Sequence, residues 1–269
     1  MPERDLLEAL IGAALEAGRA ALALQRSTLR VDEKADSSPV TQADRAAEAI
    51  ILDRLAACAG GVAVVAEEEA ACGRVPEAGT EFFLVDPLDG TREFIAGRPE
   101  FTVNIALVRA SEPVLGVVYA PALGRLYAGD AAAGRAFAAG EPARGEPGGA
   151  ASRRDIRVRP APAGGITAVA SRSHDTPETE AYLARYAVAQ RVSIGSSLKF
   201  CWVAEGRADL YPRLGPTMEW DTAAGHAVLV AAGGSVIGPD GRPLRYGKSG
   251  YRNPWFVASG SLVPLPLAA

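Results

Sequence analysis

The sequence predicts an α/β fold in which helices and sheets are layered and two lobes pack closely together. Apolar side chains recur at helical spacing in residues 3–25, β-type runs follow between residues 62 and 137, and strands alternate with helices beyond residue 165. With 269 residues and 48% hydrophobic content, the chain is long enough to bury a large core. We therefore expect a folded protein rather than a disordered one.

Two helices are expected near the N-terminus. Within residues 3–25, Leu6, Leu10 and the other apolar residues are spaced one, three and four apart, as in a helix that packs on a core. A second helix is expected at residues 41–57, because Ser38, Pro39 and Thr41 act as start signals at its beginning.

Six β-type runs come next, and Gly and Pro separate them as turns between strands require. They comprise residues 62–66, 81–85, 101–108, 114–119, 125–128 and 135–137.

A Gly-, Pro- and Arg-rich stretch at residues 138–165 predicts the lobe boundary. We expect an N-terminal α+β lobe at residues 1–150, carrying most of the candidate acidic site residues, and a C-terminal α/β lobe at residues 151–269. The second lobe should alternate strands at residues 167–170, 192–194 and 208–211 with helices at residues 177–186, 197–205 and 222–232.

The net charge of −4 and the three isolated cysteines argue against some classes of protein. A nucleic-acid surface needs clustered Lys and Arg, so nucleic acid is not an expected partner. Cys58, Cys72 and Cys201 form no C-x-x-C pair, which argues against a disulfide framework and favours a reducing cytoplasm. Charged residues interrupt the apolar stretch 6–24, so no transmembrane segment is expected. Peripheral contact with the inner membrane face and the oligomeric state stay open.

The most informative segment is E-F-F-L-V-D-P-L-D-G-T at residues 81–91, where an apolar strand runs directly into two aspartates. The proline between them prevents a helical turn, so Asp86 and Asp89 are expected to converge at the strand's carboxyl end. Two hard oxygen anions there suit Mg²⁺. Gly90 lets a ligand approach the backbone, and a helix beginning at Thr91 would point N–H groups at a phosphate. Taken alone, the segment is equally compatible with an acidic turn.

Three further segments place acids in comparable positions. Glu67 begins a run of three glutamates directly after the strand at residues 62–66. Asp221 precedes the apolar helix at residues 222–232, and Asp44 lies in the first turn of the second helix. Each has an ordinary structural alternative, namely a solvated acidic run or helix capping. Only the joint occurrence of all four segments favours a shared site.

Together these segments resemble the inositol monophosphatase and fructose-bisphosphatase superfamily. The four matching motifs span most of the chain: P-V-T-Q-A-D at 39–44, A-E-E at 66–68, D-P-L-D-G-T at 86–91 and W-D-T-A-A-G at 220–225. Within it, D-G-T-R-E-F-I, F-T-V-N-I-A-L, S-R-S-H, G-S-S-L-K-F and the run at 204–228 resemble the 3′(2′),5′-bisphosphate nucleotidases of the CysQ type. The resemblance implies a five-layer αβαβα sandwich. One departure is Ala66, where these nucleotidases often carry serine.

The resemblance implies two or three Mg²⁺ ions per site. Glu67, Asp86 and the Leu88 carbonyl would hold the first ion. Asp86, Asp89 and Asp221 would hold the second, and a third, weaker ion would also use Glu67.

The motif leaves one metal ligand open, and the resemblance assigns the catalytic residues. Glu68 is the alternative to Glu67 as a ligand, because three consecutive glutamates leave the frame of the motif open. Asp44 and Thr91 are implied as the pair that activates the attacking water, so Asp44, Thr91 and Glu67 form the expected catalytic set.

A second group of residues suggests how the substrate binds. Lys199 follows Gly195 and Ser196 at an expected strand-to-helix turn, where N–H groups and an ammonium suit a second phosphate. The resemblance adds Arg172 and Ser173 as nucleotide contacts. The complete expected substrate-binding set is Asp89, Gly90, Thr91, Arg172, Ser173, Gly195, Ser196, Lys199 and Asp221.

The function implied by the resemblance is in-line hydrolysis of 3′-phosphoadenosine 5′-phosphate to AMP and phosphate, with 3′-phosphoadenylyl sulfate as a further candidate substrate. A role in sulfur assimilation and sensitivity to lithium would follow. The nearest alternative is an inositol monophosphatase or related sugar phosphatase, because the metal motifs are shared. An alternative of another class is a noncatalytic nucleotide-binding regulator. A histidine phosphoenzyme is disfavoured, since His226 lies on an apolar helix and is expected to pack.

Overall fold

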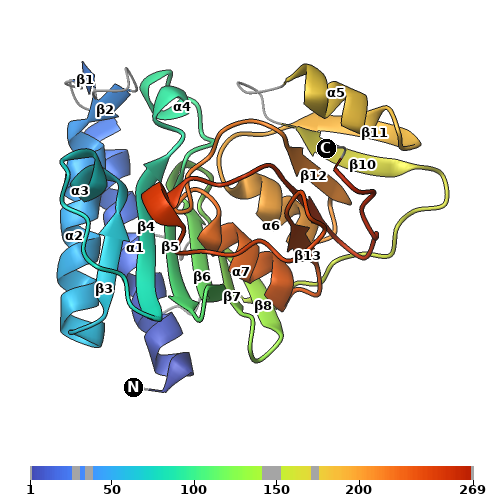
Figure 1. Cartoon of the computed structure of the whole chain (residues 1–269). Coiled ribbons are helices and arrows are strands. Elements are labelled where there is room, and N and C mark those ends of the chain that lie inside the picture. The colour runs from blue at the N-terminus through green and yellow to red at the C-terminus, as the bar shows by residue number, and fades with distance from the viewer. Residues whose placement is uncertain (1, 26–30, 34–38, 141–152, 171–175, 268–269) are drawn as a thin grey trace.

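The computed structural model describes residues 2–25, 31–33, 39–140, 153–170 and 176–267, which form alternating layers of helices and sheets (Figure 1). One helix pair covers the outer face of a seven-stranded sheet, and a second helix pair lies between that sheet and a five-stranded sheet. A further helix lies outside the second sheet. The predicted layered α/β architecture is thus confirmed.

The outer helix pair consists of α1 (Glu3–Gln25) and α2 (Gln42–Ala59). The apolar stripe of α1 is buried, as its spacing predicts. The second helix begins one residue later than predicted because Thr41 is its N-cap, and the Thr41 hydroxyl accepts the Ala43 N–H at 3.1 Å. In return, the carboxylate of Asp44 accepts the Thr41 N–H at 2.8 Å, which completes a capping box and fixes the Asp44 side chain.

The seven-stranded sheet contains all six strands predicted for the first lobe. Its neighbours pair antiparallel except β3 and β4, which are parallel. In sheet order the strands are β3 (Ala63–Ala66), β4 (Glu81–Asp89), β5 (Thr102–Arg109), β6 (Glu112–Ala120), β7 (Arg125–Asp130), β8 (Arg135–Gly140) and β9 (Arg154–Asp155).

The expected lobe boundary between residues 150 and 151 lies outside the described residues. Strand β9 follows that boundary and still pairs with β8, so the first sheet receives its last strand from the second half of the chain.

The five-stranded sheet and its helices confirm the alternation predicted beyond residue 165. Two strands were not predicted, and the helix predicted to end at residue 186 ends at Leu183. In sheet order the strands are β11 (Val188–Ser193), β10 (Ile166–Ala170), β12 (Leu210–Arg213), β14 (Phe256–Ser259) and β13 (Ser235–Ile237). The helices are α5 (Pro177–Leu183), α6 (Leu198–Ala204) and α7 (Ala223–Ala231).

Short elements complete the chain. They are β1 (Val31–Glu33), β2 (Pro39–Thr41), α3 (Glu67–Ala71), α4 (Thr91–Ile95), and the 3₁₀ turns η1 (Pro121–Leu123) and η2 (Ser249–Tyr251).

Helix α7 lies unusually close to the first sheet. A Cβ atom on Gly116 would be 2.3 Å from the Ala224 carbonyl oxygen, and one on Gly129 would be 2.7 Å from the Val228 Cα. Strands β6 and β7 therefore need glycine at these positions for the helix to pack. This packing places the start of α7, and with it Asp221, beside the carboxyl end of β4.

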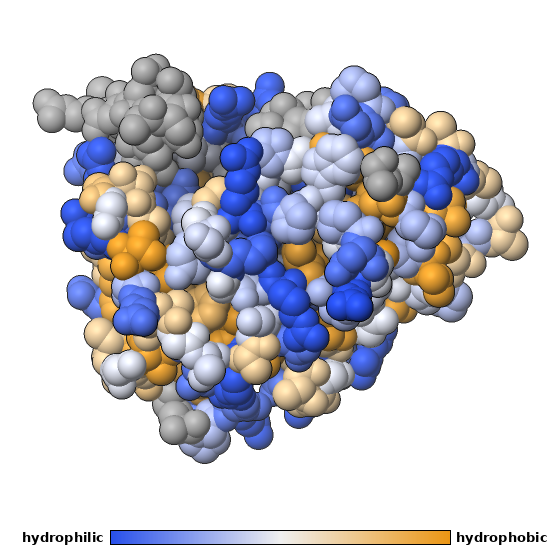
Figure 2. Space-filling view, viewed as in Figure 1, coloured by the Kyte–Doolittle hydropathy of each residue, from blue (hydrophilic) through white to orange (hydrophobic). Residues whose placement is uncertain are grey.

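The face of the molecule seen in Figure 2 is largely hydrophilic, with apolar side chains scattered between charged ones. Among the described residues, no helix has the length and apolar character needed to cross a bilayer.

Candidate active site

A pocket of about 1000 Å³ opens at the carboxyl end of β4, a volume suited to a small-molecule ligand. It brings together segments from β3–α3, β4–α4, β11–α6 and the start of α7. The expected site residues that line it are Glu67, Asp86, Leu88, Asp89, Gly90, Thr91, Gly195, Ser196, Lys199 and Asp221. Arg172 and Ser173 lie outside the described residues.

Three carboxylates form the centre of the pocket. Oxygen atoms of Glu67, Asp86 and Asp221 all lie within 4.8 Å of one another. The parallel register explains the first two, because Ala66 pairs with Val85 and the next residue of each chain emerges at the same sheet edge. The third carboxylate comes from the loop before α7.

The side chains of Asp86 and Asp89 both reach this pocket because β4 contains a bulge. In the pairing with β5, Asp86 lies opposite Asn104. Asp89 lies opposite Thr102, so three steps along β4 match two along β5. Side chains alternate along a regular strand, and the extra residue brings two positions three apart onto one face. Pro87 is tolerated there because a bulge leaves an N–H without a ladder partner.

Asp89 lies beside the three central carboxylates rather than within that group. Its Oδ2 accepts the Ser197 N–H at 2.7 Å and lies 3.5 Å from the Asn104 amide nitrogen. The Ser197 hydroxyl donates to the Asp221 carbonyl at 2.6 Å. Ser197, which sequence reasoning did not include in the site, thus links the start of α6 to two of the acidic segments.

The structure distinguishes Glu67 from Glu68. Only Glu67 belongs to the carboxylate group and lines the pocket. The buried Glu48 carboxylate accepts the N–H groups of Glu68 and Glu69 at 2.8 and 3.0 Å, which holds the first turn of α3. Burial raises the pKa of Glu48 to about 7. The geometry therefore favours Glu67 over Glu68 as the candidate metal ligand.

Thr91 and Asp44 are in contact although they are 47 residues apart. The Thr91 hydroxyl lies 3.3 Å from Asp44 Oδ1 and 3.3 Å from the Leu88 carbonyl oxygen, and both of these can only accept. The other oxygen of Asp44 is held by the Thr41 N–H and hydroxyl. Helix α4 begins at Thr91 after Gly90, whose φ of +94° favours glycine.

The carboxyl groups in the pocket are electrostatically costly in the absence of a cation. Burial raises the pKa of Asp86 well above 3.8, and repulsion from Glu67, Asp89 and Asp221 raises it further. The pKa of Asp221 is also well above its usual value, first through burial and then through Asp89 and Glu67. A set of converging hard oxygen donors with this charge fits Mg²⁺, which would relieve the repulsion.

These pKa shifts predict how the stability of the metal-free protein depends on pH. Because the folded state raises the pKa of Asp221 above 3.8, folded protein retains a proton that unfolded protein releases. This stabilisation is present at low pH and is lost as the pH rises through the folded-state pKa. Asp221→Asn should therefore raise the metal-free thermal midpoint, and the gain over wild type should grow as the pH rises above 3.8 towards the raised folded-state pKa. A gain that is independent of pH would contradict the prediction.

A cationic region lies in the same pocket. Lys199 is buried, with its ammonium 2.6 Å from the Ser196 carbonyl oxygen, and burial lowers its pKa to about 8. Arg213, at the end of β12, is also buried and lines the pocket. Its Nη2 donates to the Pro216 carbonyl at 2.7 Å, while its Nε has no hydrogen-bond partner among the described residues. Sequence reasoning missed Arg213, whose only signal was a basic residue two positions after the predicted strand at residues 208–211.

Histidine and cysteine play no part in the pocket lining of the described residues. His226 packs against Tyr246, with Nδ1 3.0 Å from the tyrosine hydroxyl, and burial lowers its pKa to about 3. It is therefore neutral, as its expected packing role requires. The three cysteines are free thiols.

Comparison with known proteins identifies the family. The family model described as the inositol monophosphatase family matches residues 3–259. The 3′(2′),5′-bisphosphate nucleotidase CysQ of Escherichia coli strain K12 is 45% identical over 257 residues, which cover 94% of this chain and 99% of that protein. The CysQ protein of Buchnera aphidicola is 38% identical over 261 residues, 95% of this chain and 94% of that protein.

Solved structures show the same fold. The crystal structure of CysQ from Bacteroides thetaiotaomicron, a bacterial member of the inositol monophosphatase family, matches with a TM-score of 0.81 and 41% identity, covering 96% of this chain and 98% of that one. The Thermotoga maritima IMPase matches with a TM-score of 0.75 and 26% identity, covering 96% of this chain and 93% of that one. This chain therefore belongs to the inositol monophosphatase family.

Proposed function

We propose that this chain is a Mg²⁺-dependent 3′(2′),5′-bisphosphate nucleotidase that hydrolyses 3′-phosphoadenosine 5′-phosphate to AMP and phosphate. The observation that carries the proposal is that one pocket is lined both by clustered carboxylates and by the buried cations Lys199 and Arg213. The similarity to proteins named as such nucleotidases, across nearly the whole chain, supports the same activity. The three free thiols fit a reducing compartment such as the cytoplasm.

The acidic residues would hold the metal ions. Glu67, Asp86 and the Leu88 carbonyl form one candidate ligand set, and Asp86, Asp89 and Asp221 form the other. Bound there, Mg²⁺ would supply Lewis-acid polarisation and charge neutralisation at the phosphoryl group.

Asp44 and Thr91 would orient the attacking water. The Thr91 hydroxyl proton is directed at oxygen acceptors, so the Thr91 oxygen can accept a hydrogen bond from a water in the pocket. That contact would direct the water's lone pair at the phosphorus and pass a proton towards the Asp44 carboxylate. Because the capping box already fixes Asp44, this pair is preorganised.

Lys199 and Arg213 would recognise the phosphate that is not cleaved. Two cations buried beside one pocket suit a substrate with a second anionic group. Gly195 and Ser196 would add contacts from the turn before α6, where the Ser196 hydroxyl is buried and has no hydrogen-bond partner within the described parts of the chain. An inositol monophosphate has no such second phosphate, which favours the bisphosphate nucleotide over that alternative. 3′-Phosphoadenylyl sulfate, with an anionic 5′ group, would fit the same cations.

The decisive experiment compares Mg²⁺-dependent phosphate release from 3′-phosphoadenosine 5′-phosphate, 3′-AMP and inositol 1-phosphate. We expect the bisphosphate to be preferred over 3′-AMP by about 10- to 100-fold in kcat/KM, since a charged hydrogen bond contributes roughly 1.5–3 kcal/mol. Lys199→Met should remove most of this preference, because it should raise KM for the bisphosphate by more than it changes 3′-AMP hydrolysis. A wild-type preference for inositol 1-phosphate would reject the substrate assignment.

A further inference from the structure

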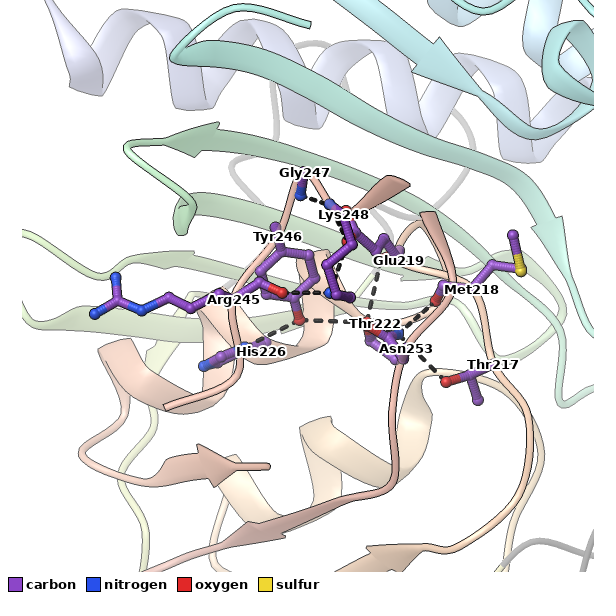
Figure 3. Close-up of polar contacts among 10 residues, drawn as sticks. All are labelled: Thr217, Met218, Glu219, Thr222, His226, Arg245, Tyr246, Gly247, Lys248 and Asn253. Atoms are coloured by element: carbon purple, nitrogen blue, oxygen red, sulfur yellow. Dashed lines mark hydrogen bonds and ion pairs between the residues drawn. The ribbon is translucent and has the colours of Figure 1, made fainter. Parts of the chain in front are cut away.

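The Glu219 carboxylate, two residues before Asp221, is fully buried and does not line the pocket. Figure 3 shows its contacts with Gly247 and Lys248. The carboxylate accepts the backbone N–H of Gly247 at 2.7 Å and that of Lys248 at 2.9 Å, and it forms an ion pair of 2.6 Å with the Lys248 ammonium. A buried carboxylate is tolerated when several donors satisfy it. These contacts attach the segment at residues 245–253, here called the C-terminal loop, to the chain that carries Asp221.

The C-terminal loop in turn supports the Asp221 side chain. The Asn253 amide group donates to the Met218 carbonyl at 2.8 Å and to the Thr222 hydroxyl at 3.0 Å. The Met218 N–H donates to Asp221 Oδ2 at 2.8 Å. A continuous set of hydrogen bonds therefore runs from the loop through Asn253 and Met218 to the Asp221 carboxylate, one of the three central carboxylates of the pocket.

The same loop shapes the pocket directly. Tyr251 and Arg252 line the pocket, and the Tyr251 ring lies 6.3 Å from that of Trp220. The φ angle of Tyr251 is +53°, a left-handed conformation that a bulky side chain disfavours. Hydrogen bonds from neighbouring segments must hold this residue in that conformation. One of them is donated by the Glu219 N–H to the Tyr251 carbonyl at 2.8 Å.

We propose that Glu219 is a positioning residue of the active site, whose carboxylate fixes the C-terminal loop and thereby holds the Asp221 carboxylate in the orientation that divalent-cation binding requires. The inference rests on the proposed function only in taking Asp221 as a metal ligand. Glu219 touches neither substrate nor metal, because it does not line the pocket. Outer contacts that orient metal ligands commonly affect metal affinity by about 10- to 100-fold.

The test measures Mg²⁺ binding to Glu219→Gln through the thermal midpoint as a function of Mg²⁺ concentration. The glutamine keeps the size of the side chain, but its amide NH₂ cannot accept from an N–H or pair with the Lys248 ammonium. We expect the half-saturating Mg²⁺ concentration to rise about 10- to 100-fold, and turnover to recover substantially at saturating Mg²⁺. Hydrogen exchange at the Gly247 and Lys248 amides should become faster.

Glu112→Gln is the matched control. Glu112 is exposed and pairs with Arg245 of the same loop, so this variant removes a carboxylate contact to the loop without touching the buried one. Its Mg²⁺ dependence should stay within about twofold of wild type, since exposed ion pairs contribute little.

Asn253→Ala tests the hydrogen bonds by which Asn253 connects the C-terminal loop to Met218. It also replaces Glu219→Gln as the test if that variant does not fold. It removes the contacts to Met218 and Thr222 without leaving a buried charge, and it should weaken Mg²⁺ binding in the same direction. Folded variants with faster loop exchange and unchanged Mg²⁺ half-saturation would overturn the positioning role. Absence of Mg²⁺ binding in the wild type would instead contradict the proposed function itself.

Discussion

Replacing Asp86 with asparagine should reduce kcat/KM for 3′-phosphoadenosine 5′-phosphate by at least about 1,000-fold, corresponding to several kcal/mol of transition-state stabilisation. Asp86 is buried and would contribute to both candidate metal ligand sets. The same change should raise the thermal midpoint of the metal-free protein, because it removes a carboxyl group that burial and three neighbouring acids disfavour in its charged form. Phosphate release and thermal unfolding, each with and without Mg²⁺, measure both effects.

Asp53→Asn is the control for this prediction, since Asp53 is exposed on α2 and does not line the pocket. It should change neither activity nor metal-dependent stability. Activity of Asp86→Asn within tenfold of wild type, or a metal-free midpoint well below wild type, would contradict the electrostatic account of the site.

Removing the Thr91 hydroxyl with Thr91→Val should lower kcat by roughly 100- to 10,000-fold while Mg²⁺ binding persists, as expected for loss of a proton-transfer contact. Asp44→Asn should cause a loss of similar size, since the Thr91 hydroxyl lies 3.3 Å from the Asp44 carboxylate. The two variants differ in stability, because Asp44 also completes the capping box of α2. Only Asp44→Asn should cost about 1 kcal/mol of unfolding free energy.

Thr91→Ser is the matched variant, because it keeps the hydroxyl and removes only a methyl group. It should retain activity within about tenfold of wild type. If Thr91→Val turned over as fast as Thr91→Ser at saturating Mg²⁺, the hydroxyl would have no part in orienting the water.

Hydrophobic spacing and the alternation of strands with helices predicted the first helix and much of the second sheet. The stripe that includes Leu6 and Leu10 specified α1, and the alternation beyond residue 165 specified the second sheet. Strand β14 was missed because its four residues, Phe256–Ser259, lie in a Gly- and Pro-rich region where no periodicity can develop. Its pairing with β12 and β13 is a long-range event that only the folded chain defines.

The acidic site could be anticipated because its residues follow strands or precede helices, where α/β folds place ligands. The bulge that turns Asp86 and Asp89 to one face could not be anticipated from the sequence, because the register between β4 and β5 defines it. Buried supporting groups such as Glu48 and Glu219 are indistinguishable in sequence from surface glutamates. Their partners lie 20 or more residues away and become visible only in three dimensions.

The central claim is that divalent cations held by the clustered carboxylates drive cleavage of a phosphate ester. Phosphate release from 3′-phosphoadenosine 5′-phosphate, measured after exhaustive chelation and again after Mg²⁺ is restored, tests it most directly. We predict that chelation abolishes turnover and that Mg²⁺ restores it fully in the wild type but not in Asp86→Asn. Hydrolysis that continues unchanged in the chelated protein would contradict the account.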